Sequence, residues 1–223
     1  MVDSDQFEYL KTVDTATLSN AIELLDVRQR NEGFAPHHIR CLFPEMGRMV
    51  GYAVTAHVET VSKGPVNRHM FVPLYEAVRD AKKPAVIVLQ EVGPHSDYAA
   101  HCGEVMATIF KRLGGVGLVS DCAVRDIPEV RTMGFQYFAK GAVPSHAYFR
   151  VVRVGITVQI EGLSVDPNDI LHGDENGLIV LPKEKLDQLP QKVDAIRTRE
   201  RRVMSYVRSS EFSFDGLRTH ILE

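Results

Sequence analysis

The segment 103–126 places a helix-forming stretch directly before a strand, and this order constrains the fold more than any other part of the sequence. Within residues 104–113 the apolar positions recur at the spacing of one helix face, and Gly114 stands where a helix C-cap is expected. Residues 116–119 then form a short apolar run, which is typical of a buried strand. The start of the helix and the segment after this strand, Arg125-Asp126, should therefore meet at one edge of a sheet, where α/β proteins bind ligands.

The rest of the chain alternates strand-like and helix-like stretches, which favours an α/β fold. The continuous apolar run 84–89 is typical of a strand covered on both faces. Strands are also expected at 49–61, 135–139 and 151–165 and in a hairpin closed by Asn176-Gly177. Helices are expected at 6–25 with Asp14 or Thr15 as a cap, in a stretch ending near residue 83, at 128–133 and from residue 183 to about 208. We expect a single domain over residues 1–208, followed by a tail, residues 209–223.

The charge balance and the cysteines limit the classes of partner. The net charge is −3 and no basic block is present, so nucleic acid is not an expected partner. Cys41, Cys102 and Cys122 cannot all pair and follow no metal-ligand spacing, which fits a reducing cytosol. The sequence has neither a signal-peptide pattern nor a long apolar span, so we expect a soluble cytoplasmic protein without a membrane segment.

Arg125 and Asp126 are the first candidate functional pair. A guanidinium group offers a planar fork of donors that matches a carboxylate or phosphate, and a neighbouring aspartate is a hard oxygen ligand suited to Mg²⁺ or Mn²⁺. A surface ion pair on a turn is the simpler interpretation, and the residue types alone favour it over a site.

The loop before Glu104 carries a second group of candidates, His95, Asp97, His101 and Cys102. A Zn²⁺ site is one interpretation, because imidazole and carboxylate suit that ion. Another is that His95 or His101 acts as a general acid or base or contacts the substrate, since histidine titrates near neutral pH. The simplest alternative is a solvated loop.

Several motifs resemble one known family. The spacing of Glu104 and Arg125-Asp126 within Gly-Glu-x-x-Ala and Asp-x-Ala-Val-Arg-Asp resembles the RraA-like superfamily and its 4-hydroxy-4-methyl-2-oxoglutarate/4-carboxy-4-hydroxy-2-oxoadipate aldolases. Further motifs agree in order and spacing: 17–21, 42–55, Gly134-Phe135, 138–144 and 172–182. The resemblance covers roughly residues 10–205. It implies a swivelling β/β/α-type mixed sheet core flanked by helices, assembled into a homotrimer or a hexamer.

The resemblance also implies roles for individual residues. Arg125 would bind the carboxylate of a pyruvate-like unit, and Asp126 would hold a divalent metal, Mg²⁺ or Mn²⁺. Glu104 stands where the aldolases usually have aspartate and would act on a metal-bound water. Gly103 and the backbone N–H groups of Val105 and Met106, at the start of a helix, would bind the substrate carboxylate or carbonyl.

Two further implications concern neighbouring subunits. In the aldolases a glutamate from the C-terminal helix of an adjacent subunit completes the active site, and Glu200 is the residue here that corresponds in position. A solvated or salt-bridged helix residue is the competing interpretation, since arginines surround Glu200. The apolar residues of the tail, 209–223, suggest that it packs on a partner subunit.

The implied function is a metal-dependent lyase that cleaves a 4-hydroxy-2-oxo acid to give pyruvate through a metal-stabilised enolate, and oxaloacetate decarboxylation draws on the same chemistry. The expected partners are a small 2-oxo acid and copies of the same chain. A non-catalytic RraA-type regulator that binds a ribonuclease is one alternative, and a divergent lyase on another carboxylate substrate is a second. The carboxylate of Asp126 favours the lyase, because the regulator type lacks a carboxylate at that position.

Overall fold

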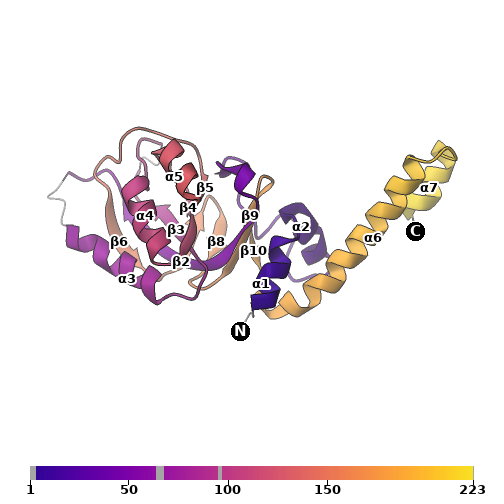
Figure 1. Ribbon diagram of the computed structural model, residues 1–223, viewed down its shortest axis with the longest axis horizontal. Coiled ribbons are helices and arrows are strands. Elements are labelled where there is room, and N and C mark those ends of the chain that lie inside the picture. Colours follow the sequence, from indigo (N-terminus) through magenta and orange to yellow (C-terminus); the bar gives the residue numbers. More distant parts are fainter. Residues whose placement is uncertain (1–3, 64–67, 95–96, 223) are drawn as a thin grey trace.

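Parallel strands form the centre of the structure, a computed structural model that describes residues 4–63, 68–94 and 97–222 (Figure 1). The central strands are β2 (Met49–Glu59), β3 (Ala85–Glu91), β4 (Gly115–Ser120) and β5 (Gln136–Ala139), and each is parallel to the next in this order. Helix α4 (Glu104–Arg112) connects β3 to β4, and α5 (Ile127–Met133) connects β4 to β5. The carboxyl ends of β3, β4 and β5 therefore lie at the same edge of the sheet.

Antiparallel strands extend this sheet on both sides. On one side β9 (Ile170–Asp174) and β6 (Arg150–Val154) both pair with β2, and β10 (Gly177–Leu181) pairs with β9 in the predicted hairpin. On the other side β1 (Arg40–Cys41) pairs with β5, and β1 also contacts β10, so the sheet is nearly closed. A separate hairpin, β7 (Val158–Ile160) and β8 (Leu163–Val165), packs its apolar side chains against the sheet.

Helices cover the sheet through two further apolar clusters. In the first, α3 (Val72–Asp80), α4 and α5 lie against β2 to β5, with Phe110 and Leu118 fully buried between them. In the second, α1 (Ser4–Lys11), α2 (Thr15–Glu23) and the start of α6 (Leu189–Val207) pack on β2, β9 and β10. The remaining short helices are η1 (Pro44–Met46), η2 (Arg68–Phe71) and η3 (Lys183–Gln188). Among the described residues, we find no helix with the length and apolar character needed to cross a membrane.

The expectation of one helix over residues 6–25 is wrong, because the chain forms α1 and α2 with a break between them. Asp14 lies in this break with an extended backbone, and its carboxylate accepts hydrogen bonds from the backbone N and the Oγ1 of Thr17, each at 2.8 Å. A residue that caps a helix in this way cannot be inside one. Asp14 is thus the predicted cap, and it begins a second helix.

The C-terminal helices extend away from the sheet. Leu189 and Val193 bury the first turns of α6 against α2, and the rest of α6 projects from the body of the protein (Figure 1). Helix α7 (Phe214–Leu222) folds back against the far end of α6, where the rings of Tyr206 and His220 stack at 3.9 Å. The predicted tail therefore contains a helix over Phe214–Leu222, and its contact with a partner subunit stays a prediction.

Candidate functional site

Two loops at the carboxyl edge of the sheet run side by side and bring the candidate residues together. The backbone N of His101 donates to the carbonyl of Ala123 at 2.8 Å, and the backbone N of Arg125 donates to the carbonyl of Cys102 at 2.9 Å. These bonds place the segment that enters α4 parallel to the segment that leaves β4. Glu104, which begins α4, consequently lies next to Asp126, as the sequence pattern predicts.

The carboxylate of Asp126 connects the two loops. Its Oδ2 accepts a hydrogen bond from the backbone N of Glu104 at 2.8 Å and lies 3.6 Å from Nε of Arg125. Asp126 directly precedes α5, but its side chain makes no capping bond to α5 and instead caps the start of α4. The backbone of Asp126 is left-handed, with φ of 57°, which aspartate tolerates better than most residues.

Gly103 allows this close approach. A Cβ on residue 103 would lie 2.4 Å from Oδ2 of Asp126 and 2.9 Å from Nε of Arg125, so a side chain here would push both groups away. The requirement for glycine is one of space, because the φ of Gly103 is −135° and lies in the extended region.

One oxygen of Asp126 remains available. The side chain is 35% exposed, and within the part of the chain that the structure describes its Oδ1 accepts no hydrogen bond. Mg²⁺ and Mn²⁺ take hard oxygen ligands, and Mg²⁺ is usually held by one or two carboxylates together with waters. Asp126 therefore fits the metal role that the sequence suggests, with Glu104 as an exposed second carboxylate beside it.

A pocket of about 740 Å³ opens beside these loops. Six of the candidate residues line it: His101, Cys102, Gly103, Val105, Met106 and Arg125. Glu104 and Asp126 are not among the described lining residues, although both adjoin residues that are. The Arg125 side chain is 38% exposed, and its Nη1 lies 3.4 Å from the carbonyl of Pro144. The guanidinium group thus retains donors for a ligand in the pocket.

The structure does not bring Glu200 to this pocket within one chain. Glu200 is exposed on α6 and lines a separate groove of about 450 Å³ between α2 and α6. His95, the other candidate for acid or base chemistry, lies outside the described residues.

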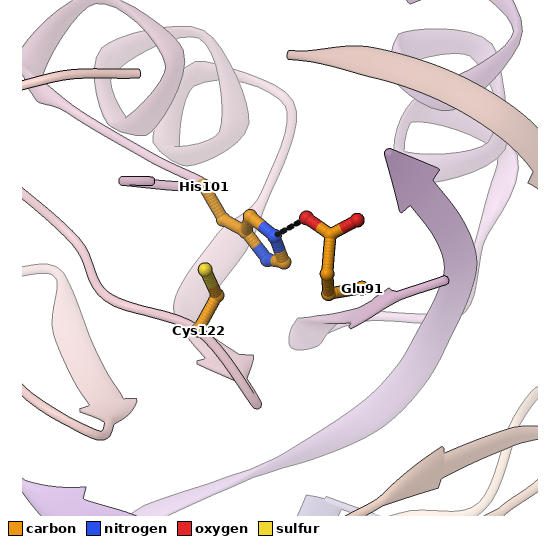
Figure 2. A group of neighbouring side chains, drawn as sticks. All are labelled: Glu91, His101 and Cys122. Atoms are coloured by element: carbon orange, nitrogen blue, oxygen red, sulfur yellow. Dashed lines mark hydrogen bonds and ion pairs between the residues drawn. The ribbon is translucent and has the colours of Figure 1, made fainter. Parts of the chain in front are cut away.

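His101 belongs to a buried polar group below the pocket. It is 0% exposed, so the interpretation of a solvated loop is wrong for this residue. Its Nε2 donates to Oε2 of Glu91 at 3.1 Å, and its Nδ1 lies 2.9 Å from Oγ of Ser120, which donates to it. Figure 2 shows His101 between Glu91 and Cys122, with its ring directed at the carboxylate. Burial lowers the pKa of His101, which keeps the ring neutral near neutral pH.

Glu91 is ionised despite its burial. Desolvation opposes the charge, but hydrogen bonds from His101, from Thr60 Oγ1 at 2.7 Å and from the backbone N of Gly93 at 2.7 Å hold the pKa of Glu91 below its usual value. Three donors converge on this one carboxylate. The arrangement fixes the end of β2, the end of β3 and the loop that leads into α4.

Glu91, His101 and Cys122 also place one ligand atom each within 4.8 Å of one another, as a metal site would. Each group already has another partner, since the Sγ of Cys122 donates to the carbonyl of Ala99 at 2.9 Å. Burial raises the pKa of the Cys122 thiol to about 11, which favours the protonated form. The hydrogen bonds therefore account for this group without an ion.

Asp121 lies beside the buried group and is strongly perturbed. Its Oδ1 accepts from the backbone N of Glu91 at 2.8 Å, and burial raises its pKa to about 7. The backbone hydrogen bond from Glu91 and the charge of Lys140 oppose this rise in pKa, and the ammonium group of Lys140 also lies 2.5 Å from Glu161 in a salt bridge.

Sequence reasoning missed the buried partners and most of the pocket wall. Glu91 directly follows an apolar strand, which is a signal that the residue lies at the carboxyl edge of the sheet. The aromatic wall, formed by Phe71, Tyr75 and Phe149, had no such signal, because these rings come from three separate elements.

Comparison with known proteins gives a family pattern and distant relatives. The pattern of the RraA-like family, described as Aldolase/RraA, matches residues 15–180. An uncharacterized protein of Methanocaldococcus jannaschii is 30% identical over 122 residues, which are 54% of this chain and 59% of that protein. A putative 4-hydroxy-4-methyl-2-oxoglutarate aldolase of Halalkalibacterium halodurans is 27% identical over 118 residues, which are 52% of this chain and 55% of that protein. The chain thus covers less than two thirds of the length of these curated relatives.

Solved structures share the fold over more of the chain. An uncharacterized protein from Pseudomonas syringae pv. tomato has a TM-score of 0.75 and 23% identity and covers 98% of this chain and 94% of its own. RraAS2 from Streptomyces coelicolor, described as an unusual member of the RNase ES inhibitor RraA protein family, has a TM-score of 0.69 and 22% identity and covers 90% of this chain and 96% of its own. The predicted fold class, a mixed sheet flanked by helices in a single α/β domain, is thereby confirmed.

Proposed function

Because the chain belongs to the RraA-like family, as its motifs predict, we propose that it is a divalent-metal-dependent lyase. The reaction is cleavage of the C3–C4 bond of a 4-hydroxy-2-oxo acid, which releases pyruvate. Decarboxylation of oxaloacetate draws on the same chemistry, because it also leaves negative charge on a pyruvate unit. The relative that is named a putative aldolase supports this reaction class.

The observation that carries the proposal is the pairing of a guanidinium group with an open carboxylate beside a pocket. Arg125 lines the pocket, and Asp126 follows it with one oxygen that accepts no hydrogen bond from the described residues. In a buried structural ion pair the protein itself would satisfy both side chains. Here donors and an acceptor remain for a ligand carboxylate and a cation.

The residues of the chain have separable tasks in this reaction. Arg125 binds the substrate carboxylate through its planar donors, and the backbone N–H groups of Val105 and Met106, at the start of α4, bind the same end of the substrate. Glu104 is exposed beside Asp126 and is the group that takes the proton from the 4-hydroxyl through a water. Breaking the C3–C4 bond turns that hydroxyl into the carbonyl of the second product, and C3 gains a proton.

Asp126 would hold the cation, with waters and the substrate as further ligands. Mg²⁺ or Mn²⁺, when bound, supplies Lewis-acid stabilisation of the negative charge that develops on the 2-oxo group. Arg125 places a second positive charge on the same side of the substrate and so acts in the same direction.

We also propose that the active form is a homo-oligomer in which Glu200 completes the site of a neighbouring chain. Glu200 does not line the pocket in its own chain, and it lies on α6, the helix that projects from the body (Figure 1). The end of this helix and the tail expose large apolar side chains, as a subunit contact requires: Met204, Val207, Phe212 and Phe214. Both a trimer and a hexamer are compatible with this role.

The test is pyruvate release from purified protein, followed with lactate dehydrogenase. The substrates are oxaloacetate, 4-hydroxy-4-methyl-2-oxoglutarate and 4-hydroxy-2-oxopentanoate, each with Mg²⁺ or Mn²⁺ and again with a chelator. The Asp126→Asn variant is the matched control, because free metal ions decarboxylate oxaloacetate without protein. We expect metal-dependent release above this control. No release from any of the three would exclude the lyase and leave a binding function of the RraA type as the alternative.

A further inference from the structure

We propose that the pocket selects 2-oxo acids whose distal half is apolar and uncharged, such as an aryl or alkyl group, over dicarboxylates. The inference rests on the proposed function for the orientation of the substrate, with its carboxylate at Arg125. The inference concerns the binding of 2-oxo acids as well as their cleavage, so binding and turnover can be tested separately.

Aromatic rings form one wall of the pocket. The ring of Phe71 lies 5.7 Å from that of Phe149 and 6.3 Å from that of Tyr75, and both pairs are stacked. Phe149 is 6% exposed and packs edge-on against His101 at 5.7 Å. Because η2, α3 and the segment before β6 each contribute one ring, the wall is part of the packed core. A ligand group in contact with it is removed from water and gains most if it is apolar.

The described lining residues of the pocket supply charge for only one carboxylate. Among the lining residues that the structure describes, Arg125 is the only permanent cation. His101 keeps its ring nitrogens bonded to Glu91 and Ser120, and Nδ1 of His146 donates to the carbonyl of Ala147 at 2.8 Å. Against the rings a second ligand carboxylate would find no cation among the described lining residues, and burying an unpaired charge is costly.

The size of the pocket leaves room for a large distal group. Its volume of about 740 Å³ lies within the range of sites that hold drug-sized ligands, roughly 300–1,000 Å³, and a pyruvate unit alone would leave most of it empty. Val105, which is 74% exposed, adds another apolar side chain to the lining near the start of α4. Specificity is therefore expected to come from the half of the substrate that does not react.

The direct test is titration calorimetry of the full chain with Mg²⁺, using phenylpyruvate and 2-oxoglutarate as probes. Both are 2-oxo acids, and they differ in whether the distal half is an aromatic ring or a carboxylate. We expect phenylpyruvate to bind at least tenfold more tightly. Equal or tighter binding of 2-oxoglutarate overturns the inference, and so does the absence of binding by either probe.

A charge variant tests the same point from the protein side. Val105→Lys adds a cation to the lining at an exposed position, and Val72→Lys is the matched control, because Val72 is 44% exposed in the first turn of α3 and is not a lining residue. We expect Val105→Lys to shift the affinity ratio about tenfold toward 2-oxoglutarate and Val72→Lys to leave it unchanged. An unchanged ratio in Val105→Lys, or the same shift in both variants, overturns the inference.

Turnover separates this inference from the function on which it rests. If both stand, 4-hydroxy-4-phenyl-2-oxobutanoate is cleaved to pyruvate and benzaldehyde with a kcat/KM at least tenfold above that for 4-hydroxy-4-methyl-2-oxoglutarate. Faster cleavage of the dicarboxylate overturns the inference and leaves the lyase intact. Preferential binding of phenylpyruvate without cleavage of any substrate would instead count against the lyase alone.

Discussion

Two polar groups lie at the same edge of the sheet, one closed and one open. In the closed group, Glu91, His101 and Ser120 are buried, and their side chains bond to one another or to neighbouring protein atoms. In the open group, Arg125 and Asp126 are about one third exposed and keep donors and an acceptor toward the pocket and solvent. Both follow the carboxyl ends of parallel strands, so position alone does not distinguish a structural group from a site. The open group differs in its exposure and in the bonding capacity that it leaves for a ligand, and for this reason we propose it as the site.

The comparison predicts that the two groups respond to mutation in opposite ways. A change in the closed group should cost stability, since buried donors lose their acceptor. A change in the open group should cost activity and leave stability nearly unchanged. Activity and unfolding therefore need to be measured on the same variants.

The largest effect is expected for Asp126→Asn. Asparagine tolerates the left-handed backbone and can still accept the bond from the Glu104 N–H, so only the charge is lost. Pyruvate release should fall by about 10³-fold, because several kcal/mol of charge stabilisation depends on the metal. The free energy of unfolding, measured by urea denaturation, should change by less than about 0.5 kcal/mol. A large loss of stability with normal turnover would mean that Asp126 holds the structure together and takes no part in the reaction.

The second effect is expected for Glu91→Ala, which should lower stability, whereas Asp126→Asn should lower activity. The substitution leaves Thr60 Oγ1 and His101 Nε2 without their buried acceptor, and the free energy of unfolding should fall by about 3 kcal/mol. Urea denaturation followed by circular dichroism measures this. A fall in the free energy of unfolding of less than about 1 kcal/mol would contradict the structural role. If a metal ion stabilised the wild type against unfolding but not the Glu91→Ala variant, Glu91, His101 and Cys122 would instead be a metal site.

Arg125→Lys should have a smaller effect on activity than Asp126→Asn. Lysine keeps the charge but cannot reproduce the planar fork, so kcat/KM should fall about tenfold, with little change in unfolding. Comparison with Arg125→Met separates the contribution of charge from that of geometry. Full activity in the lysine variant would mean that the arginine acts only as a point charge.

The last effect concerns the pH dependence of stability and comes from Asp121, beside the closed group. Since burial raises the pKa of Asp121 to about 7, the folded state binds more protons than the unfolded state between about pH 4 and pH 7, and stability falls as pH rises through that range. Asp121→Asn keeps the acceptor for the Glu91 N–H and should remove this decline, with a gain of up to about 4 kcal/mol at pH 8 and none at pH 4. Urea denaturation at both pH values tests the sign. Parallel pH profiles for variant and wild type would contradict the shift.

Much of this edge can be predicted from sequence, because local patterns determine it. The apolar run that became β3 and the helical spacing that became α4 place Glu104 near Arg125-Asp126. The break between α1 and α2 was missed because helical periodicity outweighed the capping signal at Asp14. A cap gains its effect from one hydrogen bond, which periodicity does not register.

The closed group and the pocket wall could not be predicted, because long-range packing determines them. Thr60 and Glu91 are 31 residues apart, and only the pairing of β2 with β3 brings them into contact. The stacked rings of Phe71 and Phe149 are likewise distant in sequence. The roles of the open pair, in contrast, follow from residue chemistry and family resemblance and stay predictions until turnover is measured.

The left-handed backbone of Asp126 has a consequence for how the protein would change under selection. Residues other than glycine adopt this conformation at a cost of about 1–2 kcal/mol, somewhat less for aspartate, and glycine adopts it freely. A population selected for stability alone should therefore accept asparagine at position 126, because asparagine tolerates the left-handed backbone and keeps the acceptor for α4, although it would lose the proposed metal ligand. In descendants of this chain, the residue at position 126 would record whether the lineage still depended on turnover.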